Sequence, residues 1–318
     1  MSETFELDDG AGLRLQFSAL GACWLGGQLQ GRELLLSLGS PEQHAAQPGF
    51  VGGIVGRYAN RIGGARFPVD GQLHQLPPNE GPNLLHGGAP GFHTRLWTVR
   101  RHDAHALHLA LHASDGDQGF PGALDIELSY CLLGPGHLRL AWAVRCSRPC
   151  PVNLTSHAYF NLDGDGCSIE GHRLQVDASR VLLTGPQGLP LGEPSDVTGT
   201  RFDLREPGPA CGRDGAGFDH NFCWTPLFEG GRGARLLSAD GRVSLQVTSD
   251  LPGLQVYTGD HLREARRLDG SATPPRAGLA LEPQYWPDSP NHAHWPQSLV
   301  RPGLVQEHGI DYRFKWQA

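Results

Sequence analysis

Apolar and polar residues alternate with a period of two along much of this 318-residue chain. A β-strand sends successive side chains to opposite faces, so the pattern predicts strands that are buried on one face. Clusters of Gly, Pro, Asp and Asn, such as SDGDQGFPG and SADGR, separate these runs and are typical of turns. The clearest runs are GLRLQFSAL, HALHLALHA, ALDIELSYCLL, HLRLAWAVRC, HRLQVDAS and RVSLQVTSD. Together they predict an all-β protein, a large antiparallel β-sandwich that could hold a concave cleft on one sheet.

The organisation of the chain favours one domain. No fixed-period repeat and no low-complexity linker interrupts the sequence, so nothing marks a domain boundary. The 44 glycines and 25 prolines fit many turns and few long helices. We therefore expect a single domain over residues 1–318.

Charge and cysteine usage limit the partners and the compartment. The formal net charge of −7 gives no reason to expect nucleic acid or an anionic membrane surface as a partner. The first ten residues, MSETFELDDG, lack the apolar core of a signal peptide, and no apolar run is long enough for a membrane span. Seven cysteines without a C-x-x-C pair indicate reduced thiols. These features predict a soluble cytoplasmic protein, and they carry no signal for its oligomeric state.

One residue count excludes a reaction type. Lys315 is the only lysine in the chain, and it lies near the end of the sequence. A Schiff-base mechanism needs a buried lysine with a lowered pKa. Lys315 is a poor candidate for that role.

Polar groups gather beside aromatic residues in several segments. Sugar sites need Asp, Glu, Asn and Arg for hydroxyl pairs, together with an aromatic face for the apolar side of the ring. Each segment alone is compatible with a structural role, and Arg57 and Asn60 especially so. No G-K-[ST] follows the glycine-rich stretch, which argues against a phosphate-binding loop. The segments are VGGIVGRYANRIGGARF with Arg57, Asn60 and Arg61, NEGPNLLHGG with His86, NLTSHAYFNLDG with His157, GFDHNF with Asp219, and LALEPQYWPDSPN with Glu282.

Two histidine groups do not indicate a metal site. His102, His105 and His108 are spaced by three, and on one strand that spacing sends successive rings to opposite faces. His292 and His294 lie in a proline-rich segment without an obvious third ligand, so we expect them on the solvated surface.

Seven segments of the chain resemble motifs of the aldose 1-epimerase family, also called the galactose mutarotase family, and they occur in the same order along the sequence. The resemblance runs from about residue 50 to the end, whereas the first 50 residues match only in their strand pattern. The family more often has Asn and Ser where Ser156 and Ala158 stand, and these two residues flank His157 without replacing it. The matching segments are GRYANRIGGARF, NLLHGG, DGDQGFPG, NLTSHAYFNL, FDHNF, SDLPGLQVYTG and LEPQYWPDSPN.

The resemblance implies a β-sandwich enzyme that interconverts the α and β anomers of free aldohexoses such as galactose and glucose. It also implies the residue roles. Glu282 would be the catalytic base and His157 the catalytic acid. The substrate would be held by His86, Asp219, Arg61 and Asn60.

The residue types themselves support this chemistry. Ring opening requires a proton to leave the C1 hydroxyl while another reaches the ring oxygen, and ring closure reverses both transfers. A carboxylate and a histidine can exchange these roles near neutral pH, and a nearby carboxylate is expected to favour the charged imidazolium. This pair supplies both transfers, so no metal or organic cofactor is expected.

Other functions remain open from the sequence. A non-catalytic sugar-binding or regulatory protein could keep the same fold, although such a binder needs neither Glu282 nor His157. A glycoside hydrolase could use Asp219 and Glu282 as its two carboxylates. A phosphosugar epimerase is less favoured, because the sequence has no compact cluster of basic residues beyond Arg57 and Arg61 to hold a phosphate.

Overall fold

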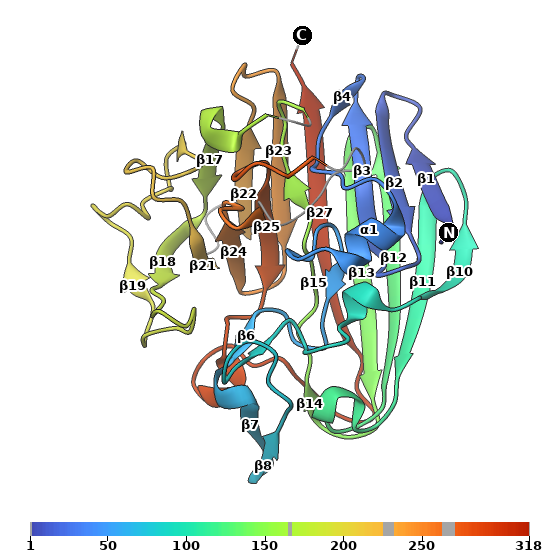
Figure 1. The fold of residues 1–318 in the computed structure, drawn as a ribbon, viewed down its shortest axis with the longest axis vertical. Helices are drawn as coiled ribbons and strands as arrows, with labels where there is room; N and C mark the ends of the chain where they lie inside the picture. The colour runs from blue at the N-terminus through green and yellow to red at the C-terminus, as the bar shows by residue number, and fades with distance from the viewer. Residues whose placement is uncertain (1, 165–166, 225–231, 263–270, 318) are drawn as a thin grey trace.

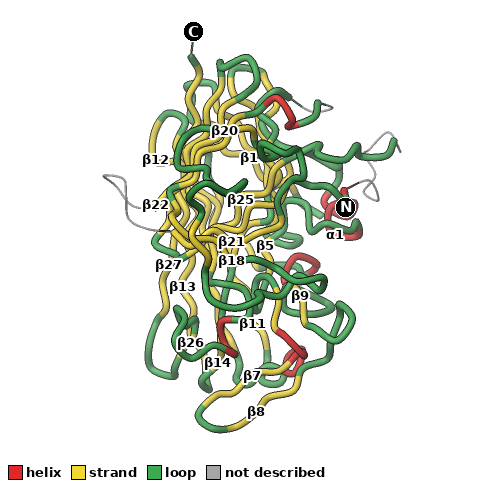
Figure 2. Tube along the Cα trace, turned by 90° about the vertical axis from the view of Figure 1, so that its left-hand side faces the viewer, coloured by secondary structure: helices red, strands yellow, loops and turns green. Residues whose placement is uncertain are grey.

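The described part of the chain is built almost entirely from strands, turns and loops (Figures 1 and 2). A computed structural model describes residues 2–164, 167–224, 232–262 and 271–317. Within these ranges the only α-helix is α1 (Pro41–Ala46), which starts with a reciprocal capping box between Ser40 and Gln43. The 3₁₀ turns are Gly63–Ala65, Phe92–Thr94, Asp117–Gly119, Ile169–Gly171 and Ser289–Asn291. The all-β prediction is confirmed.

One layer is a nine-stranded sheet whose described pairings are all antiparallel. Its last strand in chain order, β27, lies in the middle of the sheet between β13 and β23. In spatial order the strands are β10 (Thr98–His102), β11 (Ala106–Ala113), β12 (Leu124–Gly134), β13 (His137–Cys146), β27 (Gln306–Trp316), β23 (Val243–Ser249), β22 (Arg232–Leu237), β17 (Arg173–Val176) and β20 (Gly208–Pro209).

Two smaller sheets form the opposing layer. The first contains β1 (Thr4–Asp8), β2 (Leu13–Ser18), β3 (Cys23–Leu29) and β4 (Arg32–Glu33). The second contains, in order, β16 (Tyr159–Phe160), β25 (Leu279–Gln284), β24 (Gly253–Tyr257), β21 (Asp219–Trp224), β18 (Ala178–Leu182) and β19 (Ser195–Asp196). Backbone hydrogen bonds from Leu36 to Tyr159 and from Asn161 to Leu34, both 2.9 Å, join the two sheets.

Four short strand pairs complete the described secondary structure. They connect the loops at the ends of the layers, and the β7–β8 hairpin projects at the lower end of Figure 1. The pairs are β5 (Ile54–Val55) with β15 (Thr155–Ser156), β6 (Arg61–Ile62) with β9 (Leu84–Leu85), β7 (Arg66–Val69) with β8 (Gln72–Gln75), and β14 (Cys150–Pro151) with β26 (Leu299–Val300).

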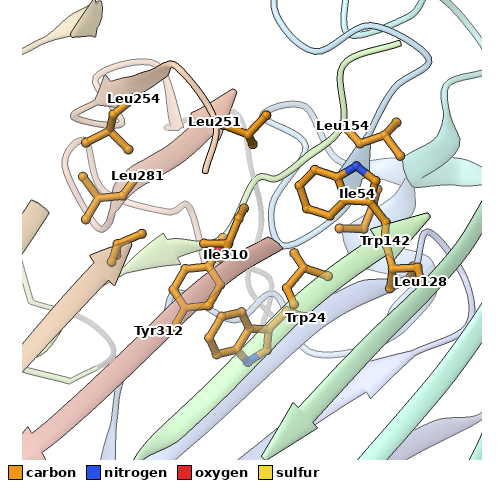
Figure 3. Packing of buried hydrophobic residues seen from close by; sticks show 14 of the residues in the cluster. Trp24, Ile54, Leu128, Trp142, Leu154, Leu251, Leu254, Leu281, Ile310 and Tyr312 are labelled. Carbon is orange, nitrogen blue, oxygen red and sulfur yellow. The ribbon is translucent and has the colours of Figure 1, made fainter. Parts of the chain in front are cut away.

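A continuous hydrophobic core lies between the layers (Figure 3). The ring of Trp24 from β3 meets that of Tyr312 from β27 edge-on, with 5.3 Å between centroids. Phe17 of β2 packs on Tyr130 of β12 at 4.3 Å. These contacts pack the four-stranded sheet against the nine-stranded sheet, as in a β-sandwich.

The alternating runs occupy the predicted strands. Burial alternates along β12 and β13, whose inward residues are apolar and whose outward residues are mostly polar. The run HRLQVDAS spans β17 and the start of β18. Period-two patterning was therefore sufficient to place these strands.

The three histidines spaced by three are not on one strand, so that part of the prediction was wrong. His102 ends β10, His105 lies in the turn, and His108 belongs to β11. Across the described ranges no group of three or more His, Cys, Asp or Glu side chains could hold a metal ion. In the same ranges no helix is long and apolar enough to cross a membrane.

Candidate active site

Glu282 lies within β25, three residues after the start of the strand at Leu279. The register of the sheet places Gln255 of β24 opposite Glu282, and Asn221 of β21 opposite Gln255. These three side chains form a polar row across three strands on the face that is turned away from Leu281 and Leu254. Leu281 and Leu254 belong to the core, so β25 is apolar on one face and carries its carboxylate on the other.

His157 is held between β15 and β16 by its own backbone. Its carbonyl accepts from the amide of Gly52, and its amide donates to the carbonyl of Gly53, both at 2.9 Å. Its ring stacks on Tyr159 with 4.9 Å between centroids. The Nε2 atom lies 3.7 Å from Oε2 of Glu282, and both side chains are almost completely buried. The fold therefore brings together the two residues that the sequence assigned to acid and base.

Burial controls the protonation of this pair. It raises the pKa of Glu282 well above its ordinary value, an effect that Asp219 reinforces and Arg61 opposes. Burial also lowers the pKa of His157 to about 3. Both groups are therefore favoured in their neutral forms. The expectation that the carboxylate would make His157 cationic is wrong here, because the loss of hydration outweighs the attraction across 3.7 Å.

The tautomer of His86 is fixed by Asn60. The amide of Asn60 donates to Nδ1 of His86 at 3.1 Å, and the amide of His86 donates to the carbonyl of Asn60 at the same distance. Burial holds the pKa of His86 well below its ordinary value, so the ring is neutral. A neutral ring that accepts at Nδ1 carries its hydrogen on Nε2. His86 is therefore a hydrogen-bond donor next to His157, with 5.3 Å between the ring centroids.

Arg61 and Asp219 form the more exposed side of the site. Arg61 donates to both oxygens of Glu80 at 2.7 and 2.9 Å, a bidentate pair that fixes its guanidinium. Its Nη1 atom lies 4.0 Å from Oδ2 of Asp219. Gln255 donates to Oδ1 of Asp219 at 2.6 Å. Asp219 is half-exposed, so this carboxylate meets solvent while Glu282 does not.

The side chains of two residues from the glycine-rich segment have partners within the fold, and the prediction that Asn60 also contacts a sugar stays a prediction. Arg57 is buried and points at a different loop, where it donates to the carbonyls of Pro121 and Gly122 at 3.2 and 2.8 Å. Asn60 acts on the site through its backbone, and its own Oδ1 accepts from the amide of Arg61. Arg57 is thus a fold residue, and Asn60 positions its neighbours.

Sequence reasoning missed Gln255 and Glu80. Both occur in segments that were singled out for other residues, SDLPGLQVYTG and NEGPNLLHGG. Gln255 contacts Asp219 and lies opposite Glu282 only because of the register of β24. Glu80 orients Arg61 across 19 residues of chain. Neither contact has a local sequence signal.

The two residues that depart from the family pattern lie inside the protein. Ser156 and Ala158 are both buried, and Ala158 belongs to the main hydrophobic core. Asn153, at the start of the same segment, donates to the carbonyl of Ala59 at 3.1 Å and accepts from the amide of Tyr285 at 2.9 Å. It therefore ties the His157 segment to the chain that follows Glu282.

Several buried polar atoms of the site have no hydrogen-bond partner among the described residues. They include Oε2 of Glu282, Nδ1 of His157, Oε1 of Gln255 and both side-chain polar atoms of Asn221. An unpaired buried polar atom costs about 1–3 kcal/mol. A polyhydroxylated ligand carries the donors and acceptors that such a row lacks.

Comparisons with known proteins show to which family the chain is similar. The sequence profile of the aldose 1-epimerase family matches residues 3–313. The chain is 37% identical to aldose 1-epimerase of Escherichia coli K12 over 294 residues, which cover 89% of this chain and 85% of the relative. It is also 37% identical to galactose mutarotase of Homo sapiens over 295 residues, covering 90% and 85% of the two chains.

The fold has solved counterparts. An aldose epimerase homologue from C. elegans superposes with a TM-score of 0.93 at 27% sequence identity, covering 100% of both chains.

Proposed function

Because this chain belongs to the aldose 1-epimerase family, we propose that it interconverts the α and β anomers of free aldohexoses such as galactose and glucose. The observation that carries the proposal is the buried pair of Glu282 and His157, 3.7 Å apart. A carboxylate and an imidazole at this separation can serve the two oxygens that exchange protons when a pyranose ring opens.

Glu282 takes the proton of the C1 hydroxyl, and His157 delivers a proton to the ring oxygen. The C1–ring-oxygen bond breaks, the open-chain aldehyde forms, and rotation about C1–C2 presents its other face. The pair then returns both protons as the ring closes. In the substrate-free site the pair is neutral, with the carboxyl group of Glu282 protonated, and transfer of that proton to His157 gives the charged pair that opens the ring. Ring opening returns the pair to its neutral form with the same number of protons. Burial favours the neutral pair, so it stabilises the stage at which the aldehyde is bound.

The neighbouring groups bind and polarise the sugar. His86 donates from Nε2 to an oxygen near C1, while Asp219 accepts from ring hydroxyls. Arg61, held by Glu80, partly offsets the negative charge of Glu282. Gln255 joins this set because it bridges Asp219 to the row that carries Glu282. The acid and base supply both proton transfers, so the proposed reaction uses no metal or organic cofactor.

The same geometry bears on the alternatives. A binding protein has no use for a carboxylic acid and an imidazole that burial keeps neutral and adjacent. A hydrolase would need Asp219 and Glu282 as its working pair. Asp219 is instead engaged by Gln255 at 2.6 Å and lies near Arg61. Release of aryl alcohol from aryl glycosides separates a hydrolase from a mutarotase, because a mutarotase releases none.

The deciding experiment is polarimetry of freshly dissolved α-galactose and α-glucose with the wild type and with Glu282→Gln. Glutamine is nearly isosteric and still bonds hydroxyls, so sugar affinity should stay within about tenfold, or ~1.4 kcal/mol. It cannot accept the C1 proton, so the rate should fall close to the spontaneous one. A folded Gln variant with full activity would show that Glu282 is not the base.

Two wider properties belong to the same proposal. The chain forms one domain, which is supported by a main core cluster that includes residues from Phe5 to Phe314. The protein works in the cytoplasm, which is supported by seven cysteines that are all unpaired.

A further inference from the structure

The outer face of the nine-stranded sheet holds a pocket of about 300 Å³ with a strongly basic lining. Four of its side chains are cationic and none is acidic, although the whole chain has a formal net charge of −7. One of the four is the only lysine of the protein. The lining consists of Arg173, Gln175, Pro207, Arg235, Leu237, Ser244, Gln246, Arg313, Lys315 and Gln317.

Strand register assembles this pocket from distant segments. Gln175 of β17, Arg235 of β22, Gln246 of β23 and Arg313 of β27 are successive cross-strand partners and form one row. Arg173, Leu237, Ser244 and Lys315 form the adjacent row on the same strands. These four strands lie side by side in Figure 1. Basic residues of the pocket that lie on different strands are 60 or more residues apart in the sequence. The sequence therefore shows no compact basic cluster, and the strand register brings these residues together.

The positive charge of the pocket is not neutralised from within. Arg235 and Lys315 have no hydrogen bond or ion pair to any described residue, and Arg173 donates only to the carbonyl of Pro207. Arg313 lies 3.9 Å from Asp311. That carboxylate already accepts from His137 and Arg139, at 2.7 and 2.8 Å. Like charges gathered on neighbouring strands repel one another, so the arrangement favours an anion above them.

The neighbouring groove over the other half of the sheet lacks this bias. It is larger, about 980 Å³, but its lining contains Glu127, Glu307 and Asp311 as well as arginines. Of these two pockets, only the smaller one has an excess of positively charged side chains in its lining.

We propose that this pocket binds a small ligand that carries at least two phosphate groups. Guanidinium groups match phosphate oxygens in bidentate fashion, and an ammonium adds a point charge. Arg235 and Arg313 stand two strands apart, or roughly 10 Å between backbones, and Arg173 is one strand further out. The four cations are therefore spread over three strand spacings, and linked phosphates can engage more of them at once than a single phosphate can. Gln175, Gln246 and Ser244 add hydrogen-bonding groups for the rest of the ligand.

The pocket is separate from the candidate active site. Glu282 lies on β25 in the opposing layer, and the hydrophobic core lies between that layer and the nine-stranded sheet. The inference therefore stands whether or not the proposed function is correct.

Titration calorimetry at low ionic strength tests the proposal with orthophosphate, pyrophosphate and tripolyphosphate as probes. We expect one site per chain and an affinity that rises about tenfold or more from orthophosphate to tripolyphosphate, because more charge-assisted hydrogen bonds form. The double variant Arg235→Gln, Lys315→Gln should weaken tripolyphosphate binding by at least about tenfold. Arg145→Gln is the matched control, because Arg145 is exposed on the same sheet outside the pocket.

Three results would overturn the proposal: no detectable tripolyphosphate binding by the wild type, equal binding by the double variant, or equal loss in Arg145→Gln. Binding of heparin without binding of tripolyphosphate would also overturn it, since it would identify a surface for long polyanions. The mutarotation rate of the double variant should equal that of the wild type. This result would show that the variant is folded, so that a loss of binding can be assigned to the pocket.

Discussion

At the scale of single residues, the candidate site depends on burial more than on charge. Glu282 and His157 are adjacent but largely without water, so each is shifted towards its neutral form. His86 is neutral as well, and its tautomer is dictated by the amide of Asn60. All three groups are thus neutral in the substrate-free site, and a proton passed from Glu282 to His157 gives the charged pair from which the proposed ring opening starts.

Replacing His157 with Asn should lower kcat/KM for mutarotation by about 10²- to 10⁴-fold, as is typical of a lost general acid. The amide keeps polar contacts but cannot deliver a proton to the ring oxygen. His93→Asn is the control, because His93 also packs on Phe50, at 4.7 Å, without an ion-pair contact to Glu282. Polarimetry should show the control within a few-fold of the wild type. Equal rates in the two variants would mean that His157 contributes only to packing and is not the catalytic acid.

Glu282 should also make stability depend on pH. Its folded pKa is raised, so the stabilisation it provides is complete below its unfolded value, near 4.3, and is lost as the pH rises through the folded value. The unfolding free energy of the wild type should therefore fall relative to Glu282→Gln as the pH rises above about 4.3. The slope is at most about 1.4 kcal/mol per pH unit. Urea denaturation at several pH values measures it, and a flat difference would contradict the raised pKa.

At the scale of elements, strand register decides which side chains meet. The alternating pattern predicted the strands, and the motifs predicted Glu282, His157, His86, Arg61 and Asp219, which the fold brings together. The roles of Gln255 and Glu80 could not be predicted, because each depends on a partner that local patterning does not specify. The same holds for the cations around Arg235, which become neighbours only through three strand pairings.

The loop that carries His86 depends on Gly87. Gly87 has a φ of +82°, and a Cβ at this position would lie 2.2 Å from the backbone of Gly56 and Arg57. Gly87→Ala should therefore lower the unfolding free energy by more than the roughly 1–2 kcal/mol of a left-handed alanine alone, and it should reduce activity by displacing His86.

Gly71→Ala is the matched control for that substitution. Gly71 has a φ of +80°, but a Cβ there would meet nothing within 4 Å. Chemical denaturation should show only the conformational cost at Gly71 and a larger loss at Gly87. Equal losses would mean that the loop adjusts to the added methyl group.

At the scale of the whole molecule, the two layers bury most of the cysteines. Cys23, Cys146, Cys150, Cys211 and Cys223 are buried, Cys131 is half-buried, and Cys167 is exposed. Burial raises the pKa of Cys150 and of Cys211 to about 11, which suppresses the reactive thiolate.

Ellman's reagent should accordingly label one thiol rapidly in the native protein, and Cys167→Ser should remove that phase. All seven thiols should react after unfolding in denaturant. Rapid labelling of several native thiols would contradict the described packing of the layers.

The position of β27 has a consequence for synthesis on the ribosome. This strand is translated after every other strand of either layer, yet it lies between β13 and β23 at the centre of the large sheet. Until it emerges, the nascent chain holds two half-sheets, each with an unpaired inner edge. Such edges can pair with other chains, so we expect the chain to be most prone to aggregation at this stage.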